Sequence, residues 1–276
     1  MRLGIHASLR RGFPNALKDA GALGCEAIQI FPYRPGEPFR FLSEAELSDF
    51  QKLRKEFALQ SLILHSVFQP NIASTNEKIR QRSRDSLLEE YRFAHAVQAD
   101  SLIIHSGSYS PDSNLREGLK KSGRTIRWAL EQCPSKTKII LENVGGGARR
   151  MGGKFEELKI LLNEIGMENR TAICLDTAHA FAAGYLLNVI SGLEDCLAEI
   201  DRTVGLARLD VFHLNDTLAE LGSHKDIHQH IGRGLIGVEP LKKLTLDRRF
   251  AEKAGILETP HLPLGSDRKN LDLLRQ

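Results

Sequence analysis

The sequence of 276 residues is poor in cysteine and has no long apolar run. Its four cysteines, Cys25, Cys133, Cys174 and Cys196, are scattered and form no CxxC pair, so neither a thiolate zinc site nor a disulfide framework is indicated. No apolar stretch reaches the ~18 residues of a membrane span. Residues 1–6 lack the basic region, apolar core and cleavage site of a signal peptide. We therefore expect a cytoplasmic protein, in a reducing compartment, with no membrane partner.

The charge balance is close to neutral and excludes little. Lys and Arg number 38 and Asp and Glu 35, which gives a net charge of +3 and a pI near 8.6. This mild excess is compatible with a polyanionic partner but does not demonstrate one. Apolar residues make up 41% and charged residues 26% of the chain. That mixture is ordinary for globular proteins, and the length suits one α/β barrel.

Short β-rich runs alternate along the chain with longer amphipathic segments. Most of the runs are continuous blocks of Ile, Leu and Val, which is typical of parallel strands covered on both faces. Strands are expected at residues 3–6, 27–31, 61–65, 101–105, 138–142, 172–176, 210–214 and 255–258. Helices are expected, among others, at residues 43–57, 76–97, 115–132, 154–165 and 192–204. Eight such units predict an α/β fold, a single (β/α)8 TIM barrel domain over residues 1–276.

Side chains that can bind metal stand at or just after the ends of six consecutive predicted strands. The nine residues are His65, His105, Glu142, Asp176, His179, His213, Asp226, His228 and Glu258. Active sites of α/β barrels form at the C-terminal ends of the strands, so these side chains are expected to converge on one rim. Imidazole with carboxylate suits zinc, manganese or iron. At roughly three to four protein ligands per ion, nine ligands suit two or three ions.

A structural interpretation competes at each of these positions. One polar residue at a strand end is ordinarily a hydrogen-bonded residue or a helix cap. Six such strand ends in succession are harder to explain in that way, and a cluster of four acids would be costly without compensating charge.

Other polar residues near the predicted rim have a structural as well as a functional interpretation. His6 ends the first predicted strand, where a supporting or core histidine is favoured over a ligand. His224 and His230 are expected on the surface of a long loop. Asn143 and Asn215 are expected to orient ligands or to contact the substrate.

Several strings of the sequence resemble blocks of the endonuclease IV family. The two longest resemble the family signatures around the sixth strand and after the seventh. The matching strings are AICLDTAHAFAAGY at 172–185, FHLND at 212–216, DIH at 226–228, LEN at 141–143, IHSGS at 104–108 and LETP at 257–260. The resemblance spans nearly the whole chain in the family's order. It implies a xylose isomerase-like TIM barrel that hydrolyses the DNA backbone 5′ to abasic sites in base excision repair.

This resemblance also implies three zinc ions (Zn2+) per chain, with Mn2+ an alternative at one of them. The first ion would be held by His65, His105 and Glu142. The second would be held by Glu142, Asp176, His213 and Glu258. The third would be held by His179, Asp226 and His228. Glu142, which bridges the first two ions, and Glu258, which helps to position the attacking hydroxide, are the implied catalytic residues.

Three stretches that contact DNA in the family depart from its pattern here. After the second strand the family's Arg is not at its usual place, and Arg34 or Arg40 would substitute for it. After the third strand Phe68 replaces a Tyr, and its ring can still wedge into a base stack. Beyond Asn215, which we expect to contact DNA, Leu218 stands where the family carries Lys or Arg. Losing a cation should weaken phosphate contacts, so we expect a divergent monomeric member that acts on double-stranded DNA with abasic sites.

Two other functions fit the same residues. A sugar isomerase or epimerase of the xylose isomerase-like group would also place His, Glu and Asp at strand ends. It would use one or two ions and would not need the set His179, Asp226 and His228. A non-catalytic barrel that binds damaged DNA or a partner is the third hypothesis, which the full retention of ligands disfavours. Fold analogy alone decides among none of these.

Overall fold

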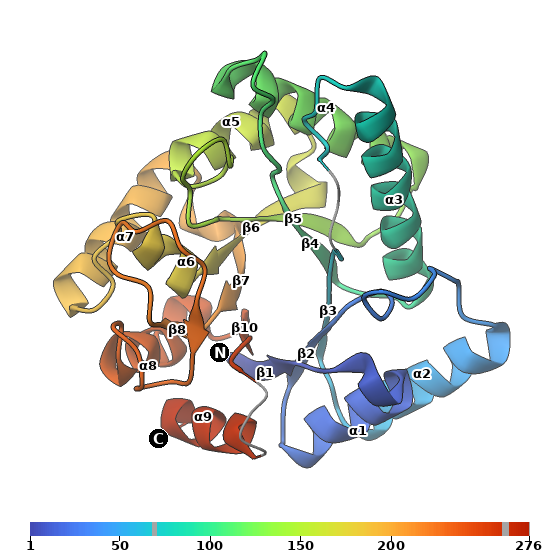
Figure 1. The fold of residues 1–276 in the computed structure, drawn as a ribbon. Coiled ribbons are helices and arrows are strands. Elements are labelled where there is room, and N and C mark those ends of the chain that lie inside the picture. Colours follow the sequence, from blue (N-terminus) through green and yellow to red (C-terminus); the bar gives the residue numbers. More distant parts are fainter. Residues whose placement is uncertain (68–70, 261–264, 276) are drawn as a thin grey trace.

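The computed structural model of the protein describes residues 1–67, 71–260 and 265–275. Eight parallel strands close into a barrel in the order β1-β10-β7-β6-β5-β4-β3-β2, and helices surround it (Figure 1). The strands are β1 (Arg2–His6), β2 (Ala27–Ile30), β3 (Ser61–His65), β4 (Ser101–His105), β5 (Lys138–Glu142), β6 (Thr171–Asp176), β7 (Leu209–His213) and β10 (Ala254–Leu257). The pairing of β1 with β10 closes the ring, so the predicted TIM barrel is confirmed.

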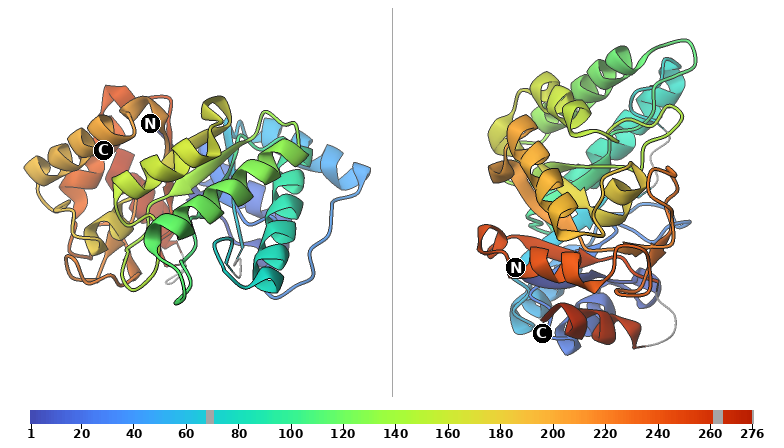
Figure 2. Two further views of the ribbon diagram at one scale, coloured as in Figure 1. Left: turned by 90° about the horizontal axis from the view of Figure 1, so that it is seen from above. Right: turned by 90° about the vertical axis from the view of Figure 1, so that its left-hand side faces the viewer.

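The helices lie on the outside of the barrel, as two further views show (Figure 2). They are α1 (Phe13–Ala22), α2 (Glu44–Glu56), α3 (Glu77–Ala96), α4 (Leu115–Gln132), α5 (Phe155–Ile165), α6 (Thr177–Ala182), α7 (Ile190–Thr203), α8 (Val238–Leu246) and α9 (Ser266–Arg275). Single 3-10 turns are η1 (Leu9–Arg11), η2 (Glu168–Arg170), η3 (Leu206–Arg208) and η4 (Arg248–Phe250). Within the three described ranges, no helix combines the length and the apolar character that crossing a membrane requires.

The predicted boundaries agree with the structure to within two residues for the eight strands and the five helices. Capping residues at the helix N-termini explain why the starts of these helices could be predicted from the sequence. Ser43 and Glu46 form a capping box at the start of α2, and the side chains of Asn76 and Asn114 accept backbone N–H groups in the first turns of α3 and α4. Such side chains satisfy N–H groups that the helix itself leaves free.

Inside the barrel, alternate residues of each strand point toward the axis and form layers. The middle layer is formed by apolar side chains, all of which are buried. It consists of Ala27, Ile63, Ile103, Ile140, Ala172, Cys174, Val211, Ala254 and Ile256. Two residues further along the same strands comes a polar layer, formed by Gln29, His65, His105, Glu142, Asp176, His213 and Glu258. The strand period of two therefore places every one of these polar side chains at the C-terminal mouth.

The opposite mouth of the barrel is also polar, but its charges are paired. A hollow of about 1100 Å³ opens there. Asp210 accepts from the Nζ atoms of both Lys138 and Lys253 at 2.6 Å, and Arg2 pairs with Glu252. Because polar residues at this end of a TIM barrel ordinarily serve stability, we regard these ion pairs as structural.

The loop of residues 216–237 differs from expectation. It contains a two-stranded antiparallel hairpin, β8 (Asp216–Thr217) with β9 (His228–Gln229), which the sequence did not predict. The buried Asp216 carboxylate accepts backbone N–H groups from Thr217, Gly232, Gly234, Ile236 and Gly237. His224 is exposed as expected. His230 is buried, with its Nδ1 3.1 Å from Asn270 Nδ2, so its predicted surface position is wrong.

The apolar middle layer generates a stability prediction. Ile103 is fully buried in that layer, whereas Ile160 on the outer face of α5 is 40% exposed. Ile103→Ala should lower the free energy of unfolding by about 2–5 kcal/mol, because it leaves a cavity in the barrel. Ile160→Ala should change it by roughly 0.5 kcal/mol or less. Urea denaturation followed by circular dichroism measures both, and equal losses would contradict the proposed packing.

Candidate metal centre

The structure brings eight of the nine predicted ligands into three groups at the C-terminal mouth. Within each group the ligand atoms lie within 4.8 Å of one another. The first group is His65, His105 and Glu142. The second is Glu142, Asp176, His213 and Glu258. The third is Asp176, His179 and His228. The ninth residue, Asp226, lies beside the third group.

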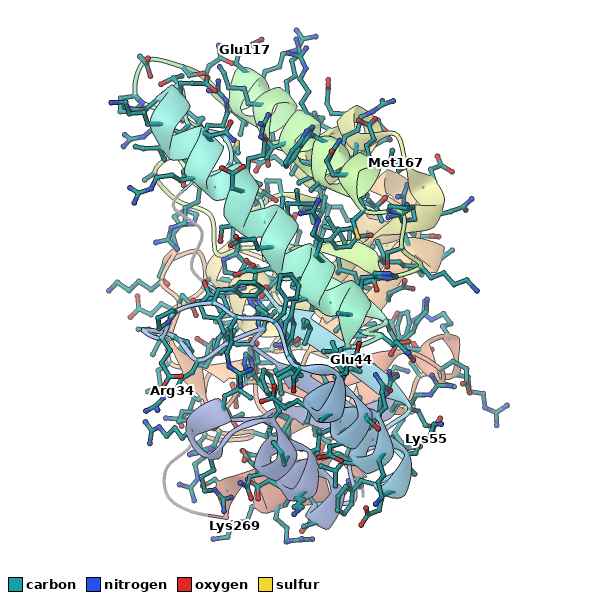
Figure 3. All side chains as sticks on the ribbon, turned by 90° about the vertical axis from the view of Figure 1, so that its right-hand side faces the viewer. Arg34, Glu44, Lys55, Glu117, Met167 and Lys269 are labelled. Carbon is teal, nitrogen blue, oxygen red and sulfur yellow. The ribbon has the colours of Figure 1, made fainter. Side chains whose placement is uncertain are left out.

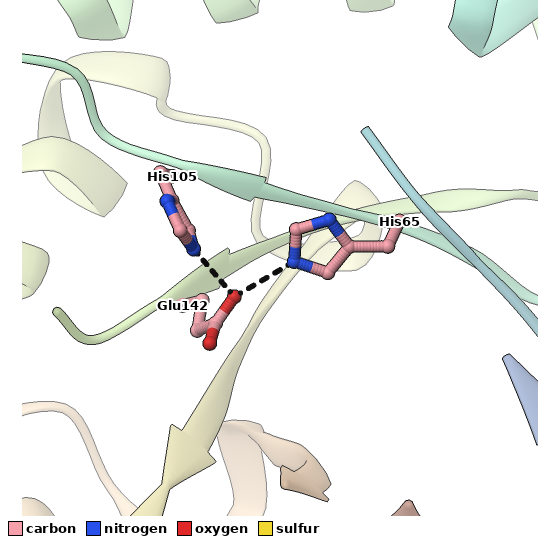
Figure 4. A group of neighbouring side chains, drawn as sticks. All are labelled: His65, His105 and Glu142. Carbon is pink, nitrogen blue, oxygen red and sulfur yellow. Dashed lines mark hydrogen bonds and ion pairs between the residues drawn. The ribbon is translucent and has the colours of Figure 1, made fainter. Parts of the chain in front are cut away.

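Glu142 joins the first group to the second. Its Oε2 lies 3.0 Å from the Nε2 atoms of both His65 and His105 (Figure 4). Its Oε1 lies 3.0 Å from Nδ1 of His213. One carboxylate thus presents a separate oxygen to each group, which is the arrangement that a bridging ligand requires.

Asp176 joins the second group to the third. Its Oδ2 lies 3.6 Å from Nδ1 of His213 and 3.7 Å from Nε2 of His228. Asp226 lies further out, 3.2 Å from Nε2 of both His179 and His228. The resemblance to the family implied Asp176 for the second ion alone, whereas here it also adjoins the third group.

Three histidines of the site are oriented by backbone carbonyl oxygens. In each, Nδ1 lies at hydrogen-bond distance from a carbonyl oxygen, which can only accept, so Nδ1 carries the proton. The pairs are His65 with Ser66 (2.9 Å), His179 with Asn143 (3.0 Å) and His228 with Glu258 (3.2 Å). The neutral form of each ring then points the lone pair of Nε2 at the carboxylates.

Gln29 orients the fourth histidine in the same way. Its Oε1 lies 2.9 Å from Nε2 of His213, while its Nε2 lies 2.6 Å from Oε1 of Glu258 and 2.9 Å from Nδ1 of His6. The amide therefore accepts from His213 and leaves the Nδ1 lone pair of that ring facing Glu142. His6 supports Glu258, 3.1 Å away, as the structural interpretation expected.

Sequence reasoning missed Gln29. The signal available was a lone amide in the otherwise apolar strand Ala27–Ile30, paired in register with His6 of the neighbouring strand. In metal-binding histidines, the hydrogen-bond partner of the nitrogen that does not bind the metal commonly fixes the orientation of the ring.

The donor set and its spacing fit metal ions. Nitrogen lone pairs that face carboxylate oxygens repel them unless a proton or a cation lies between. Nε2 of His228 is buried and has no hydrogen-bond partner among the described residues. Ligands in a tetrahedral zinc site lie roughly 3.3–3.8 Å apart, given metal–ligand distances of about 2.0–2.3 Å. The contacts of 3.0–3.7 Å between nitrogens and carboxylate oxygens are close to that spacing.

Protons would balance the charge of the site without ions. Burial alone would raise the pKa of Glu142, but His213 and His105 hold it well below its usual range. Burial alone would lower the pKa values of His213 and His179, but the neighbouring carboxylates raise both well above the ordinary value. Burial raises the pKa of the Cys174 thiol to about 12, which leaves it neutral at physiological pH. Without ions, protons on His213 and His179 would therefore pair with the neighbouring carboxylates.

Two asparagines hold the carboxylates in place. Oδ1 of Asn143 accepts from the Asp176 backbone N–H (2.7 Å), and its Nδ2 donates to the Asp176 carbonyl (3.0 Å). Nδ2 of Asn215 donates to Oδ2 of Asp176 (2.7 Å), and its Oδ1 accepts from the backbone N–H of Glu258 (2.9 Å). Asn215 is fully buried, so its side chain orients ligands, and a DNA contact would require these bonds to break.

The other predicted DNA contacts are placed at the periphery or fall outside the described residues. Arg34 lies exposed at the surface (Figure 3). It pairs with Glu37 at 2.9 Å and lines a cleft of about 490 Å³ beside Glu258. Arg40 is bound to Glu46 at the start of α2. Leu218 is 51% exposed. Phe68 lies outside the described residues.

Comparison with known proteins finds the same family along the whole chain. A family model described as a xylose isomerase-like TIM barrel matches residues 17–276. The chain is 35% identical to "Probable endonuclease 4" of Halothermothrix orenii over 94% of both chains, and 35% identical to that of Solibacter usitatus over 100% of this chain and 96% of the relative.

Solved structures agree. Endonuclease IV from Thermus thermophilus superposes with a TM-score of 0.86 at 32% identity, covering 100% of this chain and 98% of that one. A D-tagatose 3-epimerase-like protein superposes with a TM-score of 0.71 at 19% identity, covering 100% and 98%, and this likeness concerns the fold alone.

The contacts of Gln29 generate a prediction about metal affinity. Gln29→Met removes the acceptor that fixes His213 but keeps the volume of the side chain. Zinc affinity of the tightest site should fall about 10- to 100-fold, as is usual when the outer partner of a ligand is lost. Competition with a chromogenic chelator measures it. Gln81→Met, at a partly exposed position of α3 where the amide bonds only Asp85 among the described residues, is the matched control, and equal affinities of the two variants would refute the role of Gln29.

The raised histidine pKa values predict that metal binding releases protons. At neutral pH the metal-free site holds protons on His179 and His213, and a cation must displace them. Binding should therefore release protons at pH 7, release fewer as pH rises above these pKa values, and weaken as pH falls. Calorimetric titration with zinc in two buffers of different ionisation enthalpy measures the number released. Identical heats in the two buffers would contradict the prediction.

Proposed function

This chain belongs to the endonuclease IV family, and from that premise we propose that its three ligand groups hold zinc ions and that it hydrolyses the phosphodiester 5′ to abasic sites in double-stranded DNA. Full-length kinship to relatives named endonuclease 4 supports the activity. The number and identity of the ions, a monomeric state and a cytoplasmic location are parts of the proposal.

The orientation of four histidines carries the proposal. In each neutral ring one N–H is given to a fixed oxygen acceptor and the other nitrogen faces a carboxylate. Nδ1 of His179 lies, in addition, 3.1 Å from Oε1 of Glu142. A neutral imidazole that gives its N–H to such an acceptor presents a lone pair to the carboxylates, which is the arrangement of a ligand set, and only a protonated ring could donate to them instead.

The chain's own residues would hold the ions and present the scissile group to them. When bound, clustered ions lower the pKa of a water molecule toward ~7 and neutralise charge on a phosphate under in-line attack. Glu142 would bridge the first two groups with its two oxygens. Glu258 is held by His6 and Gln29, and this fixed carboxylate stands at the edge of the cleft that also contains Arg34.

The sugar isomerase alternative shares the barrel but not the sequence kinship. The epimerase-like structure is 19% identical, against 35% for two of the endonuclease relatives. The third ligand group, His179 and His228 with Asp176, is the feature that this alternative does not need. Near three zinc ions per chain would favour the nuclease, and one manganese ion would favour the isomerase.

The test is incision of a duplex that carries a single tetrahydrofuran site by purified, zinc-replete protein. The wild type should cut 5′ to the lesion. Glu142→Ala should lower the rate by at least about 10³-fold, because it removes the ligand shared by two groups, and it should bind fewer ions. Glu252→Ala, an acid at the opposite mouth with a largely exposed side chain, is the matched control and should cut at the wild-type rate.

Two results would refute the proposal. Wild-type protein with bound zinc that leaves the tetrahydrofuran duplex intact would exclude the activity. A Glu142→Ala variant that cuts as fast as the wild type would exclude the assigned metal centre. Metal analysis of the same preparations separates a loss of ions from a loss of fold.

A further inference from the structure

His224, which is not among the predicted ligands, lies in the loop that presents two residues to the third ligand group. This loop, residues 218–227, joins β8 to β9. Asp226 lies within it, and His228 follows it. The Asp226 side chain is 48% exposed, so packing does little to hold it, whereas a metal site requires ligands held to within about 0.5 Å. The contacts that fix this loop therefore decide how well the third group can bind an ion.

The backbone of the loop is attached to α6, the helix that carries His179. The Gly222 N–H donates to the Phe181 carbonyl oxygen at 3.1 Å. The His224 N–H donates to the Ala182 carbonyl oxygen at 2.9 Å. Both carbonyls stand at the C-terminal end of α6, where a helix leaves its last acceptors without internal partners. The loop is thus attached to the element that supplies a histidine of the same ligand group.

The side chain of His224 attaches the loop to a second segment, the glycine run 145–147 that follows β5. Its Nδ1 lies 2.7 Å from the carbonyl oxygen of Gly145, and Nδ1 carries the proton of this bond because a carbonyl oxygen only accepts. A Cβ added to Gly146 would lie 3.3 Å from Nδ1 of His224, and a Cβ added to Gly147 would lie 2.7 Å from its Cβ. Glycine at these two positions therefore leaves the space that the histidine occupies.

The backbone on both sides of this contact has conformations that the surroundings must hold. His224 has a φ of +58°, which is uncommon for a residue other than glycine. Gly146 and Gly147 have φ values of +72° and +82°. A strained backbone of the kind seen at His224 persists where neighbouring contacts fix it. The contact thus joins the segment that follows the shared ligand Glu142 to the loop that carries Asp226.

We propose that His224 is a positioning residue for the third ion. By packing on the glycine run, it fixes the place of Asp226 relative to His179 and His228, whose Nε2 atoms both lie 3.2 Å from the Asp226 carboxylate. The inference rests on the proposed function in one respect, that the third group holds an ion. His224 itself neither binds the ion nor takes part in the chemical step.

The test is a zinc titration in competition with a chromogenic chelator, in which Asp226→Ala marks the third ion. His224→Ala should weaken binding of the same ion about 10- to 100-fold, as is usual when an outer partner of a ligand set is lost. The affinities of the other ions should be unchanged. The double variant should bind the third ion no more weakly than Asp226→Ala alone, because the residue that His224 positions is then absent.

Two further variants separate positioning from a general loss of stability. His224→Asn should keep most of the affinity, because the asparagine amide can donate in place of Nδ1 and asparagine tolerates a positive φ. His95→Ala is the matched control, since it removes another exposed histidine, whose Nδ1 lies 2.9 Å from the Ser135 hydroxyl at the opposite mouth. It should bind every ion as the wild type does.

Several outcomes would overturn the inference. It is wrong if His224→Ala binds the third ion as tightly as the wild type, if it weakens every ion equally, or if its effect adds in full to that of Asp226→Ala. It is also wrong if Asp226→Ala changes the binding of no ion, or if His224→Asn loses as much affinity as His224→Ala.

The titrations contain no DNA, so they are independent of the incision assay. If the wild type cuts the tetrahydrofuran duplex and His224→Ala binds zinc as the wild type does, the inference fails and the nuclease stands. If the wild type fails to cut but His224→Ala still loses the third ion selectively, the nuclease is wrong and the inference stands.

Discussion

Imidazole lone pairs and carboxylates face one another in a single layer of the barrel. The electrostatic repulsion between them determines what else the site must contain. Four acids and five imidazoles gather at the mouth, several of them fully buried. A neutral imidazole nitrogen with a lone pair and an ionised carboxylate are both acceptors, so neither can donate a hydrogen bond to the other. The charge of the layer must therefore be balanced by bound protons or by metal ions. A proton turns the nitrogen that carries it into a donor, so a bound cation and a bound proton exclude each other at that nitrogen.

The barrel holds these side chains in place with buried apolar and amide side chains around them. The apolar layer directly below separates the polar layer from the hollow at the opposite mouth. The amides of Asn143, Asn215 and Gln29 fill the spaces between ligands and leave few polar atoms unsatisfied. Asp176 also caps α6, since its Oδ1 accepts from the backbone N–H of His179 at 2.7 Å. One acid thereby fixes the start of the helix that carries the next ligand.

Much of the fold could be predicted because it is encoded locally. The strand period of two, the continuous apolar runs and the caps at Ser43, Asn76 and Asn114 depend on neighbours in sequence. The nine candidate ligands stand out in the sequence because His, Asp and Glu are rare at six successive strand ends. Their grouping came from the resemblance to the family, and the geometry changed one part of it by placing Asp176 next to both His213 and His228.

The features that could not be predicted depend on contacts between distant parts of the chain. Gln29 is recognisable only once His213, 184 residues away, lies against it. The hairpin after β7 has strands of two residues and is held by the N–H groups that Asp216 collects. His230 resembled a loop residue because its partner, Asn270, belongs to the last helix.

The uneven exposure of the ligands has a consequence for how the centre is assembled. The middle group contains Glu142, Asp176 and His213, whose side chains are 0–1% exposed, whereas His105 is 47% and Asp226 48% exposed. An ion held by the middle group would have the most deeply buried of these side chains as ligands, so we expect it to exchange more slowly than ions held by the flanking groups. Brief exposure to a chelator would then remove ions from the two flanking groups and leave the ion of the middle group in place. The partly loaded protein would stay folded but would be inactive.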